Sequence, residues 1–208
     1  VLRRILVCEA QVPFVRGGAE SLVRELVGQL RRHGFETDLV SVPFQFNWEQ
    51  GVGPDEQTRF ILNVQPVMPF QMNEDWNLIA RVIVPIVSQP PLFEGGAPAS
   101  GVSDILTSFF LSPSKGRLIW GVGPAFSLPV ATALPAQTGT WAAGGSAVVL
   151  AMPGPWVLGS LFSQLSPLTD TNGPPRTNLF LWQYFVNYNF GKGWAISSAP
   201  SITANWDG

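Results

Sequence analysis

The stretch between Asn178 and Trp206 most constrains the fold, because its side chains alternate with a period of two. It reads NLFLWQYFVNYNF, passes through the glycine-rich turn GKG and ends WAISSAPSITANW. In the first arm the even positions 180–190 are all apolar or aromatic, while several odd positions are polar. Two alternating arms joined by such a turn predict a β-hairpin. A face of bulky aromatic side chains is unusual in a soluble sheet and typical of a strand that faces lipid.

The composition narrows the class of protein. Of the 208 residues, 46% are hydrophobic and only 12% are charged, whereas globular chains average about 25% charged residues. The 21 glycines and 19 prolines favour turns, and no apolar run reaches the roughly 18 residues of a membrane-spanning helix. A membrane β-barrel fits all these features. A soluble β-sandwich fits less well, since its outer face should carry charge.

Charge and chemistry exclude other classes of function. The net charge of -2 provides no basic surface for nucleic acid. A single cysteine, Cys8, excludes an internal disulfide framework, and no cluster of histidine and cysteine predicts a metal site. Carboxylate pairs such as Asp55-Glu56 stand in turns and are interpreted as solvated. We therefore predict no catalytic residue, no metal and no cofactor.

Residues 1–43 are predicted to form a separate Rossmann-like βαβ segment. A short apolar strand over 2–8 precedes a loop that ends in Gly17 and Gly18, and an amphipathic helix is predicted over 19–33. Residues 35–42 then predict a second strand. Strand, glycine-rich loop, helix and strand are the opening of a doubly wound sheet.

This segment, RILVCEAQVPFVRGGAESLVRELVGQLRRHGFETDLV, resembles the N-terminus of glycosyltransferases of the GT-B fold, family 4. In that family the Gly-Gly loop lies beside the sugar-nucleotide cleft, so the resemblance implies sugar-nucleotide binding by Gly17, Gly18 and Glu20. The family's pair of donor-site glutamates has no counterpart here, and no catalytic residue is carried over. A glycosyltransferase N-terminal fragment is thus one alternative function.

Residues 44–208 are predicted to form an antiparallel up-and-down meander, a β-barrel that is complete or partial. After a turn-rich lead-in over 44–57, about eight strands come in pairs joined by short turns. They are predicted over 58–70, 76–87, 105–111, 118–128, 141–152, 156–165 and the two arms of the hairpin above. Long connections over 88–104, 129–140 and 166–177 alternate with the short turns, as they do in outer-membrane barrels.

Tryptophans lie near the starts of the returning arms. Trp76, Trp120, Trp156 and Trp194 each follow a short turn, and Trp206 stands near the end of the last arm. Aromatic side chains at one height form a girdle at a membrane interface, so these five are predicted membrane-interface residues. The alternative is that they are core aromatics of a soluble β-sandwich that acts as a binding module.

Two further features bear on the strands. Five prolines fall inside predicted strands, where they predict bulges, edges or shorter strands: Pro66, Pro69, Pro85, Pro124 and Pro200. Arg81 is the charge inside the strand over 76–87, and its odd position predicts that it points into the lumen.

Four stretches carry a second resemblance. They are GPDEQTRFILNVQPVMPFQMNEDWNLIARVIVPIVSQP, FFLSPSKGRLIWGVGP, SAVVLAMPGPWVLGSL and NLFLWQYFVNYNFGKGWAISSAPSITANW. Together they resemble a bacterial family of uncharacterised outer-membrane β-barrel proteins that are described as transporters. The resemblance covers roughly residues 44–208. It implies an outer-membrane location, the lipid bilayer as partner, and a small solute if the barrel forms a passive pore.

The two resemblances belong to different cellular compartments, and the periodicity changes near residues 41–45. No signal peptide is visible before the first predicted strand. We interpret the chain as a chimera or a fragment, with residues 1–43 and 44–208 as its two domains.

Overall fold

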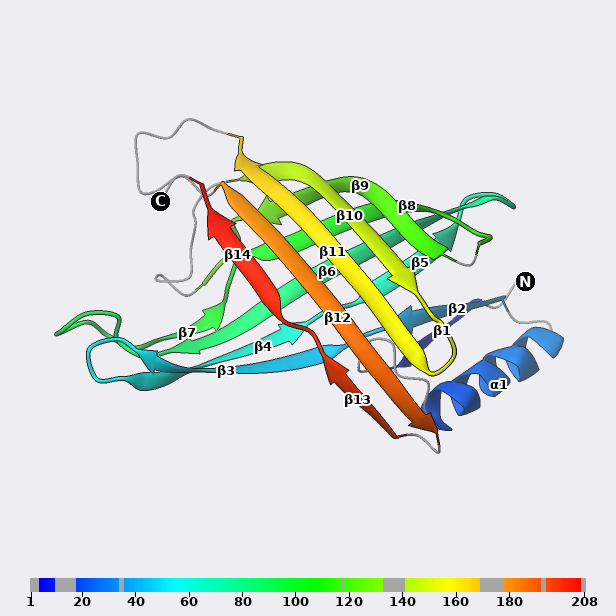
Figure 1. Ribbon diagram of the computed structural model, residues 1–208, viewed down its shortest axis with the longest axis horizontal. Coiled ribbons are helices and arrows are strands. Elements are labelled where there is room, and N and C mark those ends of the chain that lie inside the picture. Colours follow the sequence, from blue (N-terminus) through cyan, green and yellow to red (C-terminus); the bar gives the residue numbers. More distant parts are fainter. Residues whose placement is uncertain are drawn as a thin grey trace.

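The computed structural model describes residues 4–9, 18–33, 36–116, 118–132, 141–168, 178–191 and 194–206. These residues are mainly β (Figure 1): fourteen strand segments form one sheet, and helix α1 spans Gly18–Arg32. In chain order the strands are β1 (Arg4–Glu9), β2 (Glu36–Ser41), β3 (Phe44–Val52), β4 (Gln57–Val64), β5 (Val67–Gln71), β6 (Trp76–Gln89), β7 (Ala99–Val102), β8 (Ile105–Pro113), β9 (Leu118–Leu128), β10 (Ala142–Ala151), β11 (Trp156–Pro167), β12 (Leu179–Gly191), β13 (Trp194–Ser198) and β14 (Ser201–Asn205).

The N-terminal segment has the predicted order of elements. β1 and β2 pair in parallel, from Arg4 opposite Glu36 to Glu9 opposite Ser41, and α1 lies between them in the chain. The helix buries Val27 and carries Arg31 and Arg32 in its last turn, where positive charge complements the helix dipole. The likeness of this unit to a Rossmann fold remains a prediction.

From β2 onward the sheet is an antiparallel meander of nine strands, once interrupted strands are joined. Four strands are each broken into two segments: β2 with β3, β4 with β5, β7 with β8, and β13 with β14. The break shows most clearly beside β6, whose residues 77–81 pair with β5 and whose residues 84–88 pair with β4. The mainly β, antiparallel fold class predicted from the sequence is thus confirmed.

Proline stands at three of these four interruptions. A proline cannot donate a main-chain hydrogen bond, but its carbonyl still accepts one. Each carbonyl accepts from an N–H of the adjacent strand: Pro43 from Gln65 at 2.9 Å, Pro66 from Val82 at 3.0 Å, and Pro200 from Tyr184 at 3.3 Å. The ladder therefore continues across each break. The other predicted strand prolines lie within β5, β6 and β9: Pro69, Pro85 and Pro124.

Two predicted connections are in fact strands. The prediction of a turn-rich lead-in over 44–57 is wrong, because these residues form β3 and its turn to β4. Alternation of aromatic and polar residues begins at Phe44, but Gly51, Gly53 and Pro54 suggested a loop. The connection predicted over 88–104 likewise contains β7. The prediction that short turns lie at one end of the sheet and long connections at the other is therefore wrong for β3 and β4. Their short turn lies at the end where the long connections over 88–104, 129–140 and 166–177 begin.

The sheet is curled, and one face is concave (Figure 1). Side chains of β6 and β12 line one small cavity, although these strands stand five places apart in the sheet, roughly 24 Å at about 4.8 Å per strand. Only a curled sheet brings them together. The register assigns Ser127, Ala142 and Pro167 to the concave face, directly opposite one another on three neighbouring strands. The intervening side chains lie on the convex face.

Glycines on the concave face permit close approach between strands. A Cβ added to Gly144 in β10 would clash with the carbonyl oxygen of Gln164, and one at Gly123 with that of Phe109. A Cβ at Gly159 would overlap the ring of Phe185. Glycine at such positions lets a sheet bend, so these residues account for part of the curl.

We expect Gly144→Val to lower the free energy of unfolding by about 1–3 kcal/mol, the usual range for overpacking. Gly145→Val is the matched control, because a Cβ there meets nothing within 4 Å. Urea titration of the detergent-solubilised protein measures both. Equal losses in the two variants would contradict the role given to Gly144.

Candidate functional site

The convex face of the sheet is apolar and exposed. Trp48 is 64% exposed and Trp194 is 76% exposed. Other large exposed side chains on this face include Phe44, Phe46, Phe60, Leu118, Trp120, Val122, Trp156, Leu158, Phe162, Tyr184, Val186, Phe190, Ile196, Ile202 and Trp206. Within the part of the chain that the structure describes, no second layer covers them. Contiguous apolar surface of this kind marks a contact with a membrane or a partner.

The concave face carries the buried polar side chains. Asn187 is 2% exposed, the largest fully buried side chain of the described residues. Further buried polar residues on this face are Gln65, Gln89, Ser112, Ser127, Ser146 and Ser163. They lie among small apolar clusters, one of which contains Ala125, Ala142 and Leu165. The concave face therefore mixes buried polar and apolar side chains, whereas the exposed convex face is mainly apolar, and water-soluble proteins seldom expose so large an apolar surface.

Four of the five predicted interface tryptophans lie at one end of the sheet. Trp76, Trp156 and Trp194 are the first residues of β6, β11 and β13, and Trp120 is the third residue of β9. The rings of Trp76 and Trp120 make an edge contact with centroids 6.1 Å apart. All four point to the convex face at the end with the short turns.

Trp206 lies at the opposite end, just after β14. Its indole Nε1 donates to Gln164 Oε1 at 3.1 Å. Nearby on the convex face, Trp182 Nε1 donates to Ser160 Oγ at 2.8 Å, and its ring stacks on Phe162. The sequence pattern placed these side chains on one face but did not identify their polar partners, which come from neighbouring strands.

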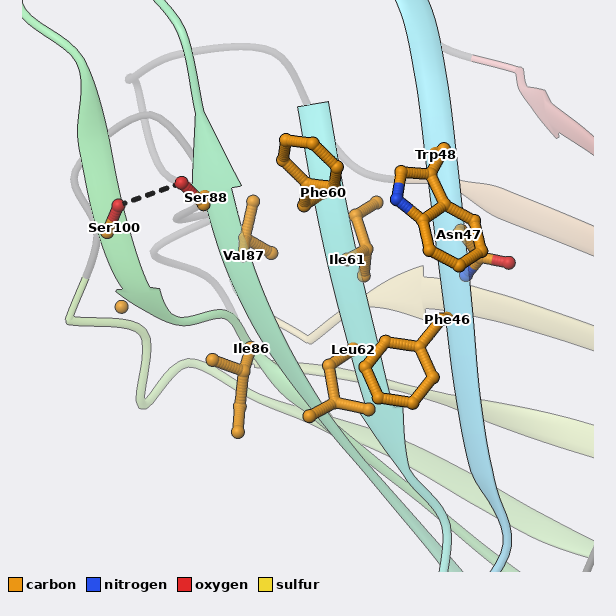
Figure 2. A pocket seen from close by; sticks show the side chains of 11 residues that line it. Phe46, Asn47, Trp48, Phe60, Ile61, Leu62, Ile86, Val87, Ser88 and Ser100 are labelled. Atoms are coloured by element: carbon orange, nitrogen blue, oxygen red, sulfur yellow. Dashed lines mark hydrogen bonds between the residues drawn. The ribbon is translucent and has the colours of Figure 1, made fainter. Parts of the chain in front are cut away.

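A shallow apolar hollow of about 340 Å³ opens on the convex face (Figure 2). Phe46 and Trp48 of β3 form one side, Phe60 and Leu62 of β4 its floor, and Ile86 of β6 the far wall. At its edge Ser88 Oγ and Ser100 Oγ are hydrogen-bonded at 3.2 Å. The hollow is continuous with the exposed apolar face and contains no charged group.

An ion pair lies on the concave face near the end with the long connections. Arg59 Nε donates to Glu49 Oε2 at 2.7 Å, and Arg59 Nη1 donates to Gln89 Oε1 at 3.3 Å. Arg59 Nη2 also contacts the Glu49 carboxylate. Gln89 Nε2 is buried and has no hydrogen-bond partner among the described residues. The sequence did not predict this cluster, because residues 44–57 were expected to form a connection.

A chain of amides runs from Arg81 along the concave face. Arg81 Nη2 donates to Gln65 Oε1 at 2.6 Å, and Gln65 Nε2 donates to Gln45 Oε1 at 2.8 Å. Gln45 Nε2 in turn donates to Asn47 Oδ1 at 3.1 Å. Each amide thus directs its oxygen toward the preceding donor. Arg81 thus lies on the concave face of the sheet, and its predicted position in a lumen remains a prediction.

Only two of the three residues predicted to bind a sugar nucleotide lie in the described part of the chain. Gly17 lies outside the described residues, while Gly18 and Glu20 belong to the first turn of α1.

Among the described residues, no three histidine, cysteine, aspartate or glutamate side chains gather to hold a metal ion. No helix in the described part of the chain has both the length and the hydropathy to cross a membrane.

No protein-family model, curated protein or solved structure matches this chain.

We expect Trp206→Phe to lower the free energy of unfolding by about 0.5–1.5 kcal/mol, because it removes the hydrogen bond to Gln164. Trp194→Phe is the matched control, since its indole N–H makes no hydrogen bond within the described residues. Thermal unfolding in one detergent compares the two. A loss confined to Trp194→Phe would contradict the contact.

Proposed function

We propose that the nine-stranded sheet is the wall of an outer-membrane β-barrel. Its convex face lies against lipid and its concave face lines the interior. The observation that carries this proposal is the continuous surface of bulky apolar side chains exposed on the convex face. A soluble β-sandwich needs two facing sheets, whereas the described residues form one sheet.

The lengths of the strands support the proposal. A β-strand that crosses a bilayer needs about 9–11 residues. β9 has 11 residues, β10 has 10, β11 has 12 and β12 has 13. Tryptophans near both ends of the convex face are also what interfacial girdles require, since their rings are apolar and their N–H groups seek polar partners.

The polar side chains on the concave face support passive passage of a small polar solute. Buried polar groups need hydrogen-bond partners, and the unpartnered Nε2 of Gln89 is suited to water or solute in such an interior. Serine hydroxyls of β9 to β11 add polar groups to this face. No step of this function requires catalysis by the chain.

The proposal is tested by electrophoresis of unheated and boiled samples after refolding into phospholipid vesicles. A membrane barrel resists detergent until boiled, so we expect the two samples to migrate differently. Sodium carbonate should leave the refolded protein in the vesicle pellet. A protein that stays in the aqueous phase without detergent and migrates identically in both states is not a membrane barrel.

Charge on the convex face gives a sharper test. Val122 lies midway along β9, is 49% exposed and faces outward. We expect Val122→Arg to lower the unfolding free energy in vesicles by about 2–4 kcal/mol, the cost of arginine at the bilayer midplane. The same substitution of a similarly exposed valine on a water-facing sheet would change the unfolding free energy by no more than about 0.5 kcal/mol.

Val130→Arg is the control for this variant. Val130 is 46% exposed, but it lies two residues beyond the end of β9, where the cost falls to about 0–1 kcal/mol. Equal effects at the two valines would exclude a lipid-facing surface.

A further inference from the structure

Arg81 is a cation on the concave face that lacks a carboxylate partner. The ion pairs of the described residues join Arg59 to Glu49 and Lys115 to Asp75. The hydrogen bond of Arg81 goes to the neutral amide of Gln65. A guanidinium has five donors and keeps its charge under physiological conditions. Arg81 is partly buried, and a partly buried charge without an opposite partner favours an anion.

The cavity beside Arg81 offers further donors. Three serines from three different strands line it together with the arginine, and the hydroxyls of Ser108 and Ser163 can donate to a ligand there. The third is Ser146, whose proton is already shared. Ser146 Oγ donates to Ser163 Oγ at 2.8 Å. The remaining lining is mostly apolar, from leucines such as Leu106 and Leu181. An arginine with hydroxyls in an apolar surround binds an anion more strongly than the same groups in water do.

The size of the cavity limits the ligand. Its volume is about 20 Å³, enough for one particle of about the size of a water molecule. A halide ion fits this space, whereas a carboxylate attached to a carbon chain does not. Gln65 Oε1 accepts from Nη2 of Arg81, and no other group of the described residues accepts from this guanidinium, so its remaining N–H groups can reach a ligand.

We propose that Arg81 and the serines beside it bind a small monovalent anion such as chloride, and that this site makes the barrel interior selective for anions. The selectivity rests on the proposed function, but binding does not, since it requires only the folded sheet. Arg59 cannot serve in the same way, because Glu49 already neutralises it.

Chloride binding is measured by ³⁵Cl NMR line broadening on the detergent-solubilised protein. We expect broadening in the wild type that bromide reverses and gluconate, at equal ionic strength, does not. Arg81→Gln should lose at least tenfold in affinity, while Arg81→Lys should keep part of it. Circular dichroism of each variant verifies the β fold. Unchanged broadening in folded Arg81→Gln, or equal competition by gluconate, would overturn the site.

The double variant Glu49→Gln with Arg59→Gln is the matched control. It removes a cation from the same face without changing the net charge, and we expect chloride broadening like that of the wild type. Loss of binding in this double variant would also overturn the assignment, since the anion would then depend on the other arginine.

Reversal potentials measured in a planar bilayer under a KCl gradient distinguish failure of the proposed anion site from failure of the proposed pore. Anion preference that is lost in Arg81→Gln supports both. Broadening without conductance supports the site and counts against the pore. Conductance without broadening overturns the site and leaves the pore standing.

Discussion

The main-chain ladder between antiparallel neighbours is the constraint on which the rest of the structure depends. Each strand must give its donors and acceptors to the next, and this holds most strictly in a medium without water. The chain contains prolines that would break such a ladder. It places them where a carbonyl still reaches the adjacent strand, as Pro43 and Pro66 do. The ladder thereby survives the three interruptions that contain proline.

The difference in size between the two faces gives the sheet its shape. Glycine, alanine and serine on β9, β10 and β11 occupy little space on the concave side, while rings such as Trp182 and Phe162 stack on the convex side. A sheet with small groups inside and large groups outside curls toward its small face. Curling brings β6 and β12 around one cavity and withdraws the polar groups there from bulk solvent.

Local pattern was enough to predict most of the sheet. The hairpins from 118 to 206 stand close to their predicted bounds, because strict alternation and short turns act over neighbouring residues. β3 was missed since Gly51 and Gly53 suggested a loop at the end of an alternating run, and β7 is too short to show a period. The odd position of Arg81 in its strand was enough to predict which face of the sheet its side chain is on. Its bond to Gln65 and the pairing of Arg59 with Glu49 could not be predicted, because they depend on the register between strands.

The number of strands in the meander has a consequence for how its two margins can meet. Within the nine-stranded meander, the first strand, β2 with β3, and the last, β13 with β14, run in the same direction, and β1, which pairs beyond β2, is parallel to it. A seam made directly between these margins must be parallel, with slanted and evenly spaced bonds. A seam of the antiparallel kind requires an odd number of additional strands between them. In a closed barrel, the direction of the strand that pairs with β14 would therefore distinguish these two kinds of seam.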